Sequence, residues 1–244
     1  MNISSPEWHI EPISAGLMQA ERILSVLCDI QTEFQHVMIV DGECFGKSLI
    51  LDGKTQSTEL DEFVYHEGLV HPSMLSHTNP KNVLIVGGGE GATAREVLKY
   101  PGVEKVTMVD IDQKLVELCE KFLPNHHMDS FSDPRLDLYF SDALEFIESL
   151  NDRFDVAIID VPDPLEFGPA FQLFTVEFFD LLKQKLTTNG IMVIQAGATG
   201  PSSQSSVSLP WQTPFHKHSV AVQDMRFLYP HLVLLGGLSQ LVTK

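Results

Sequence analysis

The chain contains 244 residues with a mass of 27.2 kDa, enough for one α/β domain with a small appendage and too large to need disulfides or a metal for its fold. Its 16 lysines and arginines against 33 aspartates and glutamates give a formal net charge of −17, which argues against a nucleic-acid ligand and favours a cationic partner. No window approaches the roughly 20 apolar residues of a membrane span, the first residues lack the basic and apolar regions of a signal peptide, and the three cysteines form no disulfide or zinc pattern. We therefore expect a reduced, cytoplasmic protein that does not bind a membrane.

The first 60 residues are expected to form a small antiparallel β domain. Between residues 23 and 58, short apolar runs alternate with the turn signals Asp41-Gly42 and Asp52-Gly53, a pattern typical of hairpins. After Glu59 the apolar spacing becomes helical, and Pro80 closes that segment.

Residues 61–244 are expected to form a Rossmann-like, doubly wound parallel sheet. Apolar runs typical of buried strands occur at residues 83–86, 105–109, 136–140, 156–159 and 191–194. Helical stretches separate them at residues 92–99, 113–122, 143–149 and 175–186. Strands that alternate with helices favour right-handed crossovers and a parallel sheet. The polar residues 202–208 are interpreted as a surface loop.

Ligands of such sheets bind beyond the carboxyl ends of the strands. The first strand ends in a glycine loop, Gly87-x-Gly89-x-x-Ala92, and the second ends in Asp110. This combination suits the ribose of a dinucleotide or of an adenosyl group, and both readings stay open here. The alternative is a tight turn in which Asp110 only caps a helix. Asp142 after the third strand could likewise cap a helix or accept a hydrogen bond from an adenine amino group.

The fourth strand is followed by two carboxylates, Asp160 and Asp163, in a turn stiffened by two prolines. Two close like charges indicate a shared cation, either an amine or a metal, against the alternative of a solvated acidic turn. The close histidine pairs His126-His127 and His216-x-His218 are interpreted as surface residues, not metal ligands. Glu90 within the glycine loop argues against the anionic pyrophosphate of a dinucleotide.

At these residues the chain resembles the polyamine aminopropyltransferases, the family of spermidine, spermine and thermospermine synthases. The resemblance runs from about Trp8 to Gly197 and rests on four motifs, namely Leu51-Asp-Gly-Lys-Thr-Gln56, Asp61-Glu-Phe-Val-Tyr65-His66-Glu67, the run from His77 to Gly91 that contains Gly87-Gly-Gly-Glu90-Gly, and Asp160-Val-Pro-Asp163-Pro. Glu90, the run from Glu166 to Thr175 and Gln195-Ala-Gly are most similar to the thermospermine branch. Glu90 and Gln172 favour spermidine as acceptor.

The resemblance implies transfer of an aminopropyl group from decarboxylated S-adenosylmethionine to a polyamine, with no redox cofactor and no metal. In it Asp160 is the proton acceptor, Tyr65 assists, and Asp163 and Glu90 hold amino groups. The implied donor-binding residues are Gln35, Gly87, Gly89, Asp110, Asp142, Ala143 and Pro169, and Gln56 and His66 are further substrate-binding residues. The family also implies a homodimer or homotetramer formed through the amino-terminal sheet.

The acidic strand ends agree with this chemistry, because an anionic cleft concentrates cationic substrates and repels the carboxylate of ordinary S-adenosylmethionine. The carboxyl end departs from the family pattern, and its last antiparallel strand pair is expected to be missing or replaced. Alternatives that remain are a putrescine-using spermidine synthase, a noncatalytic polyamine- or nucleoside-binding relative, and an ordinary methyltransferase.

Overall fold

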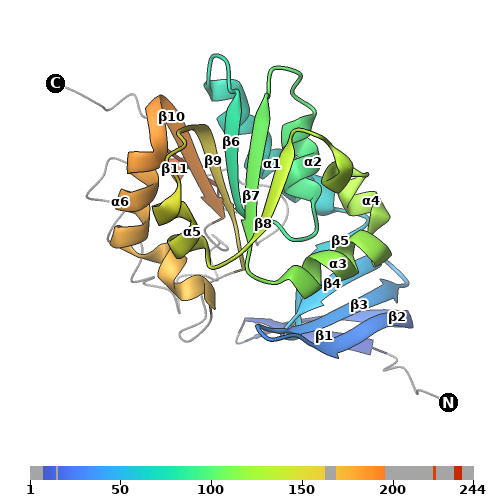
Figure 1. Ribbon diagram of the computed structural model, residues 1–244. Coiled ribbons are helices and arrows are strands. Elements are labelled where there is room, and N and C mark those ends of the chain that lie inside the picture. The colour runs from blue at the N-terminus through green and yellow to red at the C-terminus, as the bar shows by residue number, and fades with distance from the viewer. Residues whose placement is uncertain (1–7, 15, 163–168, 196–221, 224–233, 238–244) are drawn as a thin grey trace.

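The structure is a computed structural model that describes residues 8–14, 16–162, 169–195, 222–223 and 234–237. A β unit at the amino-terminal end lies against a larger α/β unit (Figure 1). The expected fold class, an antiparallel β domain followed by a doubly wound parallel sheet, is confirmed. Among the described residues, no helix has the length and apolar character needed to cross a membrane.

The amino-terminal unit is a curved antiparallel sheet, a half-barrel, whose five strands follow one another in chain order. They are β1 (Trp8–Ser14), β2 (Leu17–Gln31), β3 (His36–Gly42), β4 (Gly46–Leu51) and β5 (Lys54–Thr58). The predicted turn at Asp52-Gly53 joins β4 to β5 with positive φ angles of 49° and 77°, as a tight hairpin requires. The sheet begins earlier than the predicted start at residue 23: β1 lies wholly before that residue, and β2 starts six residues before it, at Leu17.

The α/β unit is built on a seven-stranded sheet in which the five predicted strands are parallel neighbours. In spatial order they are β10 (Leu186–Gln195), β9 (Phe154–Asp160), β6 (Asn82–Gly87), β7 (Lys105–Asp110) and β8 (Leu136–Phe140). The chain runs from β6 outwards to β8 and then crosses back to β9, so the order reverses between β6 and β9. That reversal is where a doubly wound sheet forms its binding crevice.

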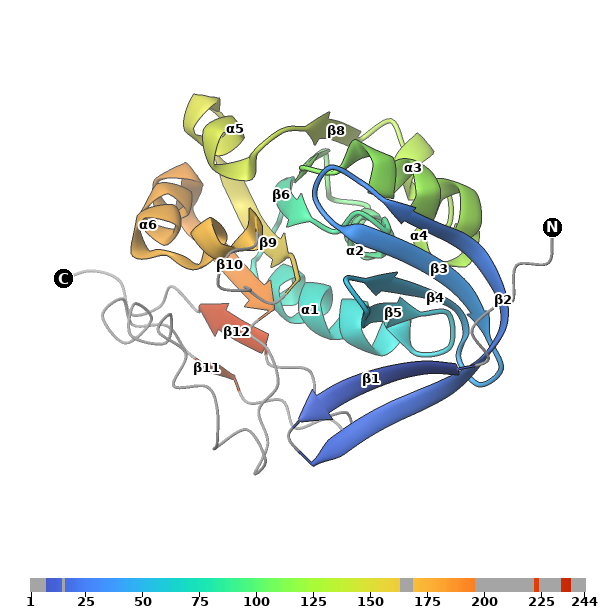
Figure 2. The same cartoon turned by 90° about the horizontal axis from the view of Figure 1, so that it is seen from below.

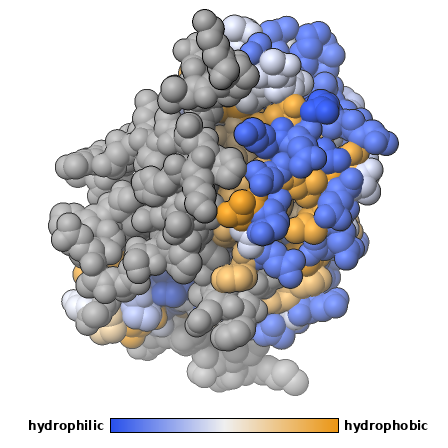
Figure 3. All heavy atoms as spheres, turned by 90° about the vertical axis from the view of Figure 1, so that its left-hand side faces the viewer, coloured by the Kyte–Doolittle hydropathy of each residue, from blue (hydrophilic) through white to orange (hydrophobic). Residues whose placement is uncertain are grey.

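Helices cover both faces of this sheet (Figure 2). One face packs against α1 (Glu62–Ser76) and α2 (Ala92–Leu98), and the other against α5 (Ala143–Ser149) and α6 (Val176–Lys185). On the outer surface of α6, hydrophilic residues surround small apolar patches (Figure 3). A further long helix, α3 (Gln113–Phe122), packs against the half-barrel, since Leu115 and Leu118 share a core cluster with Val37 and Ile39.

Short helical segments complete the described chain: α4 (Pro124–His127), η1 (Ser130–Ser132) and η2 (Pro169–Phe174). Two short strands, β11 (Val222–Gln223) and β12 (Leu234–Gly237), are antiparallel, and β12 pairs with β10. The predicted loop at residues 202–208 and most of the carboxyl end lie outside the described residues, so the expected loss of the family's last strand pair stays a prediction.

Candidate active site

The candidate site lies where β6 and β9 end side by side. Gly87 and Asp160 are partners in the parallel register, and the Gly88 amide donates to the Asp160 carbonyl at 2.8 Å. Gly87 has a φ of 80°, and a Cβ there would collide with the same carbonyl oxygen. The glycine loop and the acidic strand end therefore form one tightly joined unit, which only glycine permits at this position.

Asp160 is buried, and both of its carboxylate oxygens have hydroxyl partners. Oδ1 lies 2.5 Å from the Tyr65 hydroxyl and Oδ2 accepts from the Thr93 hydroxyl at 2.5 Å. The Tyr65 hydroxyl also lies 2.9 Å from Oε1 of Gln195. Burial raises the pKa of Asp160, and the negative charge of Glu90 raises it further, against the opposing effects of His66 and the two hydroxyls. Asp160 is thus a stronger base than an ordinary aspartate.

Asp110 ends β7 beside the glycine loop, since a Cβ on Gly89 would lie 3.0 Å from its Oδ2. Burial raises the pKa of Asp110 to about 7. Its Oδ1 accepts from the Asp112 amide at 2.9 Å. The helix α3 is capped by Asp112, whose side chain accepts from the Leu115 amide, so the alternative that Asp110 caps this helix is wrong.

Asp112 also joins the two units of the chain. Its Oδ2 accepts from the Thr32 hydroxyl at 2.7 Å and from the side-chain nitrogen Nε2 of Gln35 at 3.1 Å. Both partners lie in the turn between β2 and β3. The predicted donor-binding Gln35 is therefore held by Asp112, a residue two positions after Asp110 that the sequence did not single out.

The other predicted residues are less closely gathered. Asp142 caps α5, because its side chain accepts from two backbone amides at 2.8 and 3.2 Å. The capping role is thus confirmed, and the contact with adenine stays a prediction. Ala143 is the first residue of that helix and is buried. Gln56 lies on β5 and donates to the Lys54 carbonyl at 3.1 Å. Pro169 begins η2. Asp163 lies outside the described residues.

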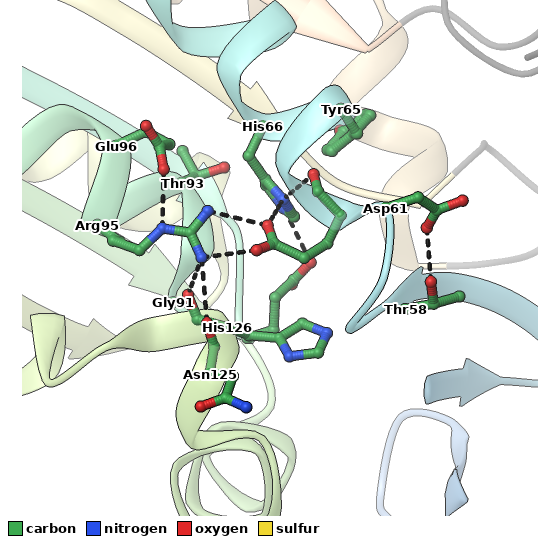
Figure 4. Close-up of polar contacts among 12 residues, drawn as sticks. Thr58, Asp61, Tyr65, His66, Gly91, Thr93, Arg95, Glu96, Asn125 and His126 are labelled. Carbon is green, nitrogen blue, oxygen red and sulfur yellow. Dashed lines mark hydrogen bonds and ion pairs between the residues drawn. The ribbon is translucent and has the colours of Figure 1, made fainter. Parts of the chain in front are cut away.

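A second set of charged side chains extends from the glycine loop into the packing between α1 and α2 (Figure 4). The imidazole of His66 is fully buried, with Nδ1 at 2.7 Å from Glu62 Oε2 and Nε2 at 3.1 Å from Glu90 Oε1. Arg95 forms a bidentate pair with Glu62 through N–H···O distances of 2.7 and 2.9 Å. The same guanidinium donates to Glu96 at 2.8 Å.

These contacts fix the charges of the cluster. Burial favours a neutral His66, but hydrogen bonds to Glu62 and Glu90 outweigh it and raise its pKa to about 10. Burial opposes ionisation of Glu62 as well, yet hydrogen bonds from His66 and Arg95 lower its pKa to about 2. For Glu90, the hydrogen bond and charge of His66 likewise outweigh burial and lower the pKa.

The predicted surface position of His126 and His127 is wrong. Both are buried, because α4 packs against α2 and His127 lies against the Phe131 ring; His216 and His218 lie outside the described residues. Among the described residues, Glu67, His71 and Glu96 could together face a metal ion. Glu96 is already paired with Arg95 at 2.8 Å and with Lys99 at 2.7 Å, so its charge is balanced and we assign no metal there.

Sequence profiles of known families cover both units of the chain. Residues 62–209 match a profile described as the spermine/spermidine synthase domain. Residues 7–59 match one described as the spermidine synthase tetramerisation domain. Together these matches include every residue of the candidate site.

Individual relatives agree with the profiles. The chain is 46% identical over 194 residues to thermospermine synthase ACAULIS5 of Arabidopsis thaliana, covering 79% of this chain but 57% of that protein. It is 49% identical over 232 residues to a polyamine aminopropyltransferase of Saccharolobus solfataricus, covering 95% of this chain and 75% of the relative.

Solved structures are similar over nearly the whole chain. A spermidine synthase in complex with the transition-state analogue AdoDATO superimposes with a TM-score of 0.83 at 30% identity, covering 94% of this chain and 79% of that one. The spermidine synthase of Thermotoga maritima gives a TM-score of 0.82 at 29% identity, with coverages of 96% and 79%.

Proposed function

The chain belongs to the spermine/spermidine synthase family, and we propose that it transfers an aminopropyl group from decarboxylated S-adenosylmethionine to a polyamine, releasing methylthioadenosine. The observation that carries the proposal is the buried Asp160 carboxylate, held at 2.5 Å by the hydroxyls of Tyr65 and Thr93 beside the glycine loop. The carboxylates of this site would repel the anionic pyrophosphate of a nicotinamide dinucleotide.

The transfer is a displacement at carbon. The neutral acceptor nitrogen attacks the methylene carbon bound to the donor's sulfonium, the C–S bond breaks, and its electron pair leaves with the sulfur as a neutral thioether. The acceptor arrives as an ammonium with a pKa near that of lysine, about 10.4, so it must first lose a proton. Asp160 accepts that proton, and its raised pKa makes the transfer less unfavourable. Tyr65 orients the accepting oxygen.

We assign the donor to the side of the crevice that faces β7. Asp110 binds the ribose diol, and Gln35 reaches the donor from the half-barrel. The proposed donor-binding set is Gln35, Gly87, Gly89, Asp110, Asp142, Ala143 and Pro169. The negative charges along this crevice repel the carboxylate of ordinary S-adenosylmethionine, which separates this activity from methyl transfer.

We propose that Glu90 and Asp163 bind the acceptor amines and that Gln56 and His66 belong to the same part of the site. We propose spermidine as acceptor and thermospermine as product. Two observations support this choice, namely Glu90 in the glycine loop and the 46% identity to a protein named as a thermospermine synthase. Putrescine as acceptor is the second candidate, since the solved structures with similar folds are named as spermidine synthases.

We further propose that the protein assembles as a homodimer or homotetramer through the half-barrel, acts in the cytoplasm and uses neither a redox cofactor nor a metal. The match of residues 7–59 to a profile described as a tetramerisation domain supports assembly. Light scattering of the purified chain tests it, because a monomer at micromolar concentration contradicts the proposed assembly.

The activity is tested by incubating the chain with decarboxylated S-adenosylmethionine and either spermidine or putrescine, and separating the polyamine products by chromatography. Thermospermine is the expected product. Asp160→Asn should abolish methylthioadenosine release, while Asp137→Asn, at an exposed pair with Lys105, serves as the matched control. Full activity of Asp160→Asn contradicts the role of Asp160. Methylthioadenosine binding without turnover identifies a noncatalytic relative, and methyl transfer from ordinary S-adenosylmethionine overturns the reaction.

A further inference from the structure

The imidazole of His66 lies between two carboxylates and has no exposed surface. Its Nδ1 lies 2.7 Å from Glu62 Oε2 and 2.8 Å from the Glu62 carbonyl oxygen, and its Nε2 lies 3.1 Å from Glu90 Oε1. An ionised carboxylate only accepts hydrogen bonds. Both ring nitrogens must therefore carry a proton, and the ring is an imidazolium that links the two acids.

Glu62 is in turn fixed by Arg95 from the neighbouring helix. The two oxygens of Glu62 accept from the two terminal nitrogens of the guanidinium at 2.7 and 2.9 Å, the fork geometry that aligns a carboxylate most strongly. Arg95 is itself buried and anchored, because it donates to Glu96 at 2.8 Å and to the His126 carbonyl at 2.5 Å (Figure 4). The orientation of Glu62 is thus set by the packing of α1 against α2 and of α2 against α4.

Charge alternates along this buried row of side chains. Glu96, Arg95, Glu62, His66 and Glu90 follow one another as anion, cation, anion, cation and anion. Glu90, in the glycine loop, is the most exposed member of the row: its side chain retains 13% exposure, against 7% for Glu62 and Arg95 and none for His66. A ligand in the crevice can contact Glu90, whereas it has no surface of His66 to contact.

We propose that Glu62 and Arg95 are positioning residues for Glu90, keeping His66 doubly protonated and oriented so that its Nε2–H holds the Glu90 carboxylate in place for a substrate amine. This inference rests on the proposed function for the identity of the ligand. It changes the role expected of His66, which acts through Glu90 and does not bind the substrate directly.

The charged groups around His66 support the same arrangement. Glu62 faces it from α1, Glu90 from the glycine loop and Asp160 from β9, and all three favour its cation, while His126 from α4 is a neighbour of the same charge type that opposes it. Arg95 balances Glu62 without contacting the ring. Removal of one carboxylate at hydrogen-bonding distance lowers a histidine pKa by about one to three units.

The experiment compares Glu62→Gln with Glu96→Gln. Each variant removes one carboxylate from the same Arg95 guanidinium, but only Glu62→Gln removes a carboxylate partner of His66; the backbone carbonyl of residue 62 is kept. Nitrogen chemical shifts of selectively labelled His66 report its protonation without any turnover, and kcat/KM for aminopropyl transfer is measured over the same pH range. In the unmodified protein, both ring nitrogens should stay protonated to at least about pH 9, since the pKa is raised to about 10.

We expect Glu62→Gln to shift the titration of His66 down by about one to three pH units and to lower kcat/KM by roughly 10- to 100-fold, because a displaced Glu90 no longer holds the amine at the reacting distance. Glu96→Gln should change neither quantity by as much as about threefold. An unchanged His66 titration in Glu62→Gln overturns the proposal, as do equal losses of activity in both variants.

Two further outcomes remain decisive. If Glu62→Gln does not fold, the titration of His66 in the unmodified protein still tests the proposal. A His66 that titrates near pH 6.5 refutes it, because the proposal requires an imidazolium. If the unmodified protein shows no aminopropyl transfer, the proposed function fails, while the titration shift in Glu62→Gln still confirms or refutes the link between Glu62, His66 and Glu90.

Discussion

Replacing Asp110 with asparagine should make the protein more stable at neutral pH while weakening its binding of the donor. Asp110 is buried at the end of β7, and its pKa is raised to about 7 from an ordinary value of 3.8. Asparagine keeps the size of the side chain and the oxygen that accepts from the Asp112 amide at 2.9 Å. The substitution therefore removes the charge and little else.

The size of the effect follows from proton linkage. Between pH 3.8 and about 7 the native Asp110 holds a proton that the unfolded chain has released, so the free energy of unfolding falls as pH rises through this window. Each pH unit costs about 1.4 kcal/mol, and the whole window costs roughly 4 kcal/mol. Asparagine does not titrate, so the free energy of unfolding of the variant does not fall with pH for this reason.

Urea unfolding of both proteins at pH 5 and pH 8 measures the effect. The difference in free energy of unfolding, variant minus unmodified protein, should grow by roughly 3 kcal/mol between these two pH values, with unchanged denaturant slopes. Calorimetry should show weaker binding of methylthioadenosine by the variant. A stability difference that is the same at both pH values would refute the reasoning, because Asp110 would then titrate alike in the folded and unfolded chains.

Three other substitutions give separate tests. Tyr65→Phe removes a hydrogen bond to a charged carboxylate, so it should lower kcat at least about tenfold and cost about 1.5–3 kcal/mol of stability; a normal kcat would exclude the hydroxyl from catalysis. Gly91→Ala, at a φ of 80° and with a Cβ that would lie 2.6 Å from the Phe131 ring, should cost at least about 2 kcal/mol of stability by denaturant unfolding, and a neutral effect would contradict the described loop geometry. Asp112→Ala removes the α3 cap and the bond from Thr32 and should cost about 2 kcal/mol, measured in the same way, with weaker methylthioadenosine binding; loss of stability without loss of binding would separate the cap from the pocket.

The parallel sheet was predictable because its strands are buried on both faces and appear as continuous apolar runs. The first strand of the half-barrel was not, since its pattern is inverted. Glu11 faces inwards and accepts from the Thr55 amide at 3.0 Å, while Trp8 and Ile10 are more than half exposed. The start of β10 was missed for a related reason: Leu186 is followed by polar residues, and a register shift separates it from Ile191.

Within the site, the strand-end residues Asp110, Asp142 and Asp160 could be located from the rule that ligands bind beyond the carboxyl ends of parallel strands. Thr93 and Arg95 could not, because their contacts with Asp160 and Glu62 arise only when α2 packs beside β9 and α1. The spacing of Glu62 and His66, four residues apart on a helix, was visible in the sequence and was the one available signal for the buried charges.

The hydrogen bonds that Thr32 and Gln35 donate to Asp112, at 2.7 and 3.1 Å, limit which chimeric proteins can be made from this chain and its relatives. A chimera that takes its half-barrel from one parent and its α/β unit from another inherits two of these side chains from the first parent and the third from the second. Such a hybrid needs all three side chains to rebuild the hydrogen bonds between its two units, however well each unit folds alone. The parents of such a chimera should therefore be chosen for matching residues at positions 32, 35 and 112, and not for overall sequence identity.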